Sequence, residues 1–108
     1  MNIRATIRGG ICGLDTVVDA WSIDGMVVRL EVKSDCPKMQ GLAAELTEVD
    51  AIEQVLRKPF VETEVACLAA EQGLHTTCLV PVGILKAVEA AAGLALPSTC
   101  TINLSRTD

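Results

Sequence analysis

Aromatic side chains are nearly absent from this sequence: Trp21 and Phe60 are the only two, and tyrosine does not occur. Proteins that bind single-stranded nucleic acid stack bases on aromatic rings, so this class is disfavoured. Clusters of Lys and Arg are also absent, and a formal net charge of −5 disfavours binding to a phosphate backbone. We therefore expect no nucleic-acid partner and a core built from Val, Ile, Leu and Ala.

The sequence also lacks the segments that direct a chain to a membrane. The first ten residues hold no apolar run of the secretory type, and the longest apolar stretch near the C-terminus is interrupted by Lys86 and Glu89. Five cysteines, an odd number, favour free or metal-bound thiols in a reducing compartment over a disulfide framework. We expect one cytoplasmic domain over residues 1–108, without membrane contact.

Period-two alternation predicts strands near both ends of the chain. Residues 2–8 and 26–33 alternate apolar with polar side chains, and residues 16–22 are rich in strand-forming types. Asp24-Gly25 is a hairpin signal between the second and third strands. Residues 99–104 alternate as well and predict a last strand. The residues expected to point inward from the third strand are Met26, Val28, Leu30 and Val32.

Between the third and last strands the apolar period changes to 3.6, which predicts helices. Pro37 suits the first helical position, with Cys36 or Asp35 as the N-cap. Four helices are expected: one that begins at Pro37, one around residues 50–56, one over residues 62–72, and one from Pro81 through Ala92. The expected fold is therefore α+β: a small antiparallel sheet of three N-terminal strands plus a C-terminal strand, with about four helices on one face.

Three cysteines lie where turns or helix starts are predicted. Cys12 lies in a Gly-Gly-Ile-Cys-Gly loop, Cys36 precedes a helix, and Cys78 follows the only histidine, His75, by three residues. Thiolates and imidazoles are the ligands that zinc and iron–sulfur clusters prefer. Asp15 could add a carboxylate or orient the imidazole. These five residues are the candidate metal ligands.

Two other interpretations of the same residues stay open. One is a sulfur carrier or enzyme, in which Cys36 accepts sulfur or attacks a substrate with His75 as base. The other is a structural or interaction domain of unknown function that holds no metal. No catalytic residue is assigned, and a protein without enzymatic activity is favoured. Cys67 and Cys100 fall on apolar faces and are expected to be core residues.

The order of these features resembles the iron–sulfur cluster assembly scaffolds of the IscU/NifU/SufU type over roughly residues 11–92: a cysteine–glycine–aspartate loop, a hairpin, a cysteine before a helix, and a His/Cys pair before a last helix. The resemblance implies an IscU/NifU-like fold and a zinc ion or nascent cluster as cofactor. The ligands it implies are Cys12, Cys36 and Cys78, with His75 as the neighbouring imidazole and Asp15 as the loop aspartate. It also implies a sulfur donor or a cluster acceptor protein as partner.

The spacing departs from those scaffolds at two points: Leu14 separates Cys-Gly from Asp15, and Thr76-Thr77 separate His75 from Cys78. The Ser-Asp-Cys-Pro, His-x-x-Cys and Leu-Ala-Leu-Pro segments also resemble small uncharacterised proteins of anaerobic bacteria and archaea, which implies no activity. The cysteine layout is distantly similar to a short domain family named for a Thr-Ser-Cys-Pro-Asp motif. Exposed edges of the first and last strands favour a homodimer.

Overall fold

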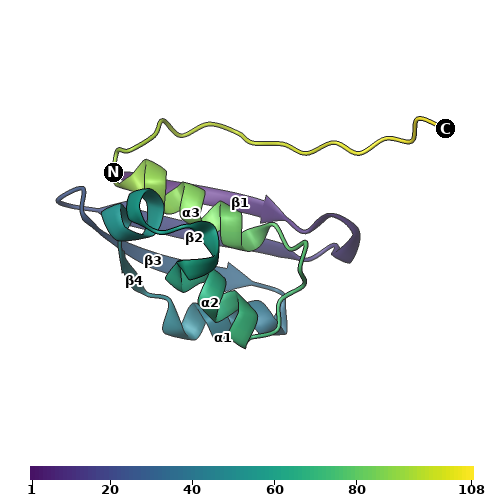
Figure 1. Ribbon diagram of the computed structural model, residues 1–108, viewed down its shortest axis with the longest axis horizontal. Coiled ribbons are helices and arrows are strands. Elements are labelled where there is room, and N and C mark those ends of the chain that lie inside the picture. The colour runs from purple at the N-terminus through teal and green to yellow at the C-terminus, as the bar shows by residue number, and fades with distance from the viewer.

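The computed structural model describes residues 1–108 and has the α+β architecture expected from the sequence. Four antiparallel strands lie in the order β1-β2-β3-β4, and the helices cover one face of the sheet (Figure 1). The strands are β1 (Asn2–Arg8), β2 (Asp15–Ser22), β3 (Val27–Ser34) and β4 (Glu48–Asp50). β1, β2 and β3 confirm the three N-terminal strands that the sequence predicted.

The hairpin between β2 and β3 is closed by short polar side chains. Ser22 Oγ accepts a hydrogen bond from the Gly25 N–H (2.9 Å), and Asp24 Oδ1 accepts from the N–H groups of Met26 (2.9 Å) and Val27 (3.0 Å). Gly25 has φ 77°, a value that favours glycine. Met26 therefore belongs to the turn and not to the strand, and its 55% exposure corrects the expectation that it points inward.

The fourth strand is not the one that the sequence predicted. Residues 99–104 form no strand and are exposed, whereas Glu48–Asp50 pairs with Val27–Arg29 of β3. Three residues are too few to show a period, which is why β4 was not predicted. Alternation at 99–104 describes the two faces of a strand but does not supply a partner for its backbone.

The helices follow the predicted order with two differences. They are α1 (Pro37–Glu45), η2 (Ile52–Arg57), α2 (Glu64–Glu71) and α3 (Val80–Ala91), with short 3-10 turns η1 (Gly10–Cys12) and η3 (Phe60–Glu62). The second predicted helix starts later than expected because Asp50 belongs to β4, and it is a single π-helical segment. Thr63 caps α2: its Oγ1 accepts from the Ala66 N–H (3.1 Å) and donates to the Phe60 carbonyl (2.7 Å).

The core lies between the inner face of the sheet and the helices. Val18, Val28, Met39, Leu42 and Ile84 are among its fully buried members. None of the helices has the length and apolar character that a membrane-spanning segment requires.

Helix α3 approaches β1 closely at Gly83. A Cβ atom at Gly83 would lie 2.9 Å from Ile7 Cγ1 and nearer still to Ile7 Cδ1, so only glycine leaves room for this contact. Because Ile7 is near the end of β1 and Gly83 near the start of α3, the helix begins at the end of the sheet where β1 finishes.

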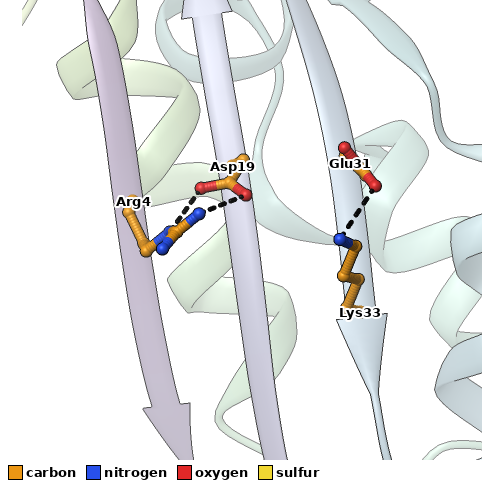
Figure 2. A network of polar contacts seen from close by, with 4 residues as sticks. All are labelled: Arg4, Asp19, Glu31 and Lys33. Atoms are coloured by element: carbon orange, nitrogen blue, oxygen red, sulfur yellow. Dashed lines mark hydrogen bonds and ion pairs between the residues drawn. The ribbon is translucent and has the colours of Figure 1, made fainter.

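The outer face of the sheet is polar. Arg4 of β1 donates two hydrogen bonds to the Asp19 carboxylate of β2 (2.7 and 3.1 Å), and on β3 Lys33 lies 3.3 Å from Glu31 (Figure 2). The Arg4 hydrogen bonds hold the pKa of Asp19 below its usual value. No helix covers this face, so these ion pairs stay in contact with solvent.

Candidate functional site

The predicted thiol and imidazole donors come to one end of the molecule. β1 and β3 both run toward this end, so the loop after β1 carries Cys12 there and the start of α1 carries Cys36 there. α3 starts at the same end, which brings the connection that contains His75 and Cys78 alongside (right side of Figure 1). We call Cys12, Cys36, His75 and Cys78 the cysteine-bearing end.

Glycines shape the loop that carries Cys12. Gly10 (φ 73°) and Gly13 (φ 69°) adopt left-handed backbone angles. The loop is closed by a hydrogen bond from the Gly9 N–H to the Leu14 carbonyl (3.0 Å). The Cys12 side chain is exposed, and its one hydrogen bond is a weak one from Sγ to the Gly9 carbonyl (3.5 Å). Cys12 is therefore accessible and loosely held.

Cys36 is the N-cap residue of α1, one of the two residues that the sequence offered for this position. Its N–H donates to Ser34 Oγ (3.1 Å), and this hydroxyl also shares a 2.7 Å hydrogen bond with the buried Thr16 Oγ1. No side chain caps the first N–H groups of α1, and the Cys36 side chain packs half-buried against the core. The Cys36 thiol therefore lies at the N-terminus of α1 and is partly shielded from solvent.

Ser34 is a positioning residue that the sequence analysis did not single out. A serine two residues before a helix start is typical of side-chain-to-backbone turns, and this pattern could have identified it. The pair that Ser34 forms with Thr16 fixes the last residue of β3 and, through it, the backbone of Cys36.

Asp15 lies near this end but its carboxylate is directed elsewhere. Its backbone carbonyl accepts from the Asp35 N–H (3.2 Å), which joins the start of β2 to the segment before α1. Its side-chain Oδ2 lies 3.9 Å from Arg8 Nη1, and both side chains are exposed. As a ligand, Asp15 would have to leave this ion pair.

His75 and Cys78 occupy a turn just before α3. The Cys78 N–H donates to the His75 carbonyl (3.1 Å), which closes the turn. His75 is exposed, whereas the Cys78 side chain is half-buried and packs against the core. The two half-buried thiols, Cys36 and Cys78, therefore each precede a helix whose inner face is in the core.

The donors share one end of the molecule without forming a ready ligand cluster. No three or more of the His, Cys, Asp and Glu side chains lie close enough together to hold a metal ion. The donor chemistry fits zinc or an iron–sulfur cluster, but the positions do not yet converge.

The two remaining cysteines differ from the expectation that they lie in the core. Cys67 and Cys100 are both free and exposed. Cys67 is on the outer side of α2, one residue before the buried Leu68, and Cys100 is in the segment that forms no strand. Small side chains on an amphipathic helix do not reveal from sequence which side of the apolar face they occupy.

Comparison with known proteins identifies a family for this chain. Residues 3–104 match the model of a family of unknown function, DUF6951. No curated protein and no solved structure matches the chain. The match is compatible with the resemblance to small uncharacterised proteins and adds no support for the IscU/NifU/SufU type. Since the match covers nearly the whole sequence, the chain belongs to the DUF6951 family.

Proposed function

We propose that this protein binds zinc or an iron–sulfur cluster at the cysteine-bearing end, in the manner of a scaffold. Cys12, Cys36 and Cys78 are the thiolate ligands and His75 is the candidate fourth ligand. The observation that carries the proposal is that three separate segments each bring one thiol to the same end of the sheet. The resemblance to IscU/NifU/SufU scaffolds supports the same ligands, and a sulfur donor or cluster acceptor is the corresponding partner.

Binding requires the loop of Cys12 to change conformation, because the donors do not converge as they stand. Cys12 is the ligand best suited to this movement: it is exposed and is held by one weak hydrogen bond. Cys36 and Cys78 pack against the core and are the fixed side of the site. Metal binding then selects the conformation in which the Cys12 loop approaches Cys36 and Cys78. The affinity for the metal is reduced by the free energy needed to reach this conformation.

Metal analysis of the whole chain tests this proposal. The protein is purified without oxygen or chelator, and zinc, iron and sulfide are measured per chain. We expect about one ion or cluster per chain, lost in Cys36→Ser and retained in the matched control Cys67→Ser, whose thiol is exposed on α2. A metal-free protein that also fails to bind zinc or to accept a reconstituted cluster contradicts the proposal.

One observation favours a second candidate function, a reactive thiol at Cys36. This thiol is half-buried at the N-terminus of the nine-residue α1, whose first N–H groups have no side-chain acceptor. Alkylation of the metal-free protein separates the two functions. A carrier or nucleophile requires one thiol that reacts much faster than the others, whereas a metal site protects Cys12, Cys36 and Cys78 together when metal is added.

A further inference from the structure

Strand β1 leaves one edge of the sheet without a partner. Met1 and Ser22 exchange hydrogen bonds, and the Gly9 N–H donates to the Leu14 carbonyl, so the odd-numbered residues between them pair with β2. Antiparallel pairing alternates, and the even-numbered residues therefore point their N–H and C=O groups away from β2. The residues with these outward backbone groups are Asn2, Arg4, Thr6 and Arg8.

The flank of the core beside this edge is incompletely covered. The inward residues of β1, Ile3, Ala5 and Ile7, are only half-buried, whereas Val18 and Ala20 on the neighbouring strand are buried. Apolar side chains of a further strand beside β1 would lie next to these three residues.

The C-terminal tail has the matching pattern and no partner of its own. Residues 95–108 contain no helix or strand, and none of their backbone groups bonds to the rest of the chain. Within the tail, Cys100, Ile102 and Leu104 alternate with polar residues, and Ile102 and Leu104 are 69% and 93% exposed. The tail leaves the end of α3 near the N-terminus and, in the view of Figure 1, runs above α3 and β1 and extends beyond them.

We propose that residues 99–104 of one chain add as a fifth strand to β1 of a second copy, and that the exchange is reciprocal. The six-residue tail segment matches the seven residues of β1 in length. Its apolar residues would lie beside Ile3, Ala5 and Ile7, and its polar residues beside the solvent-facing side chains of β1. The proposal is independent of the metal site.

Two observations favour a second copy over other occupants. Within one chain the tail forms no backbone hydrogen bond with β1. The family match ends at residue 104, at the last apolar residue of the alternating segment, so this segment belongs to the family's domain. A reciprocal exchange also pairs both free edges within one closed dimer, which removes the exposed backbone groups that promote open-ended association.

Mass measurement of the full chain over a range of concentrations tests the proposal. We expect a species of twice 11.4 kDa that dissociates on dilution. Ile102→Asp places a charge on the apolar side of the added strand, and we expect it to raise the dissociation constant at least tenfold. The matched control Thr101→Asp adds the same charge on the solvent side and should leave the dimer intact.

A second variant acts on the receiving edge. Thr6→Pro removes an N–H that points away from β2, so the pairing of β1 with β2 is retained while the added strand loses a donor. We expect Thr6→Pro to be monomeric by mass measurement and to keep the circular dichroism spectrum of the folded protein. A chain that is monomeric at every concentration overturns the proposal, as does a dimer that neither variant weakens. A monomer whose tail amides are protected from hydrogen exchange assigns the tail to its own sheet and overturns it equally.

Discussion

The close approach of α3 to β1 predicts the effect of a single added methyl group. Replacing Gly83 by alanine places a Cβ atom 2.9 Å from Ile7 Cγ1 and closer to Ile7 Cδ1. The substitution has two opposing effects. Alanine is about 1 kcal/mol more favourable than glycine inside a helix, whereas forcing an extra methyl into a packed contact costs about 1–3 kcal/mol.

We expect the packing cost to exceed the helix gain, so Gly83→Ala lowers the free energy of unfolding by about 1 kcal/mol. Ile7 sits on an edge strand and is half-buried, so it can move partly and the cost should stay near the middle of that range, about 2 kcal/mol. The assay is urea unfolding followed by circular dichroism, with the slope m compared between variants to confirm that the unfolded state is unchanged.

A double-mutant cycle with Ile7→Ala isolates the contact. That substitution removes the atoms that meet the new Cβ, so Gly83→Ala in this background should stabilise the protein by about 1 kcal/mol through helix propensity alone. The change of sign is the signature of direct contact. Equal effects of Gly83→Ala in the two backgrounds would refute the placement of α3 over the end of β1.

Three further predictions concern polar groups that hold the fold. Ser34→Ala leaves the buried Thr16 hydroxyl without its partner and should cost about 1–3 kcal/mol in urea unfolding, most of it recovered when Thr16→Val is added. Thr63→Ala removes the cap of α2 and should cost about 1–2 kcal/mol, whereas Thr63→Ser retains most of the stability. Because Arg4 lowers the pKa of Asp19, this carboxylate stabilises the fold at neutral pH and loses its contribution as the pH falls below about 4. The difference in unfolding midpoint between the natural chain and Asp19→Asn should therefore shrink in acid.

The fold was largely predictable because its signals are local. Alternation along residues 2–8 and the Asp24-Gly25 turn each determine a structure within a few residues. One error is itself local: Met26 alternates correctly, but the hydrogen bond from its N–H to Asp24, two residues earlier, retains it in the turn. The other error arises because the deciding contact is distant. Glu48–Asp50 shows no period and becomes a strand only because β3 offers an edge.

The candidate site was predictable in its chemistry and not in its geometry. The sequence identifies Cys12, Cys36 and Cys78 as thiols near turns or helix starts, and the structure places all three at such positions. Spacing along the chain does not say how far apart three loops lie, and the absence of a ready ligand cluster is visible only in the folded chain. The prediction that Cys67 and Cys100 lie in the core was wrong, because their burial also depends on how the chain folds and not on spacing alone.

Residues 99–104 have the sequence pattern of a strand but no partner strand. The alternation predicts a strand there, and the folded single chain has none, because a strand needs a partner as well as a pattern. β4 became a strand without a pattern because a partner was present, and the tail has the pattern but pairs with no strand of its own chain. β1 lacks a partner on its outer edge: its outward backbone groups pair with no strand, and its inward apolar residues are only half-buried. If a second copy supplies the missing edge, the sequence prediction and the structure of the single chain are both correct, each for a different state of the protein.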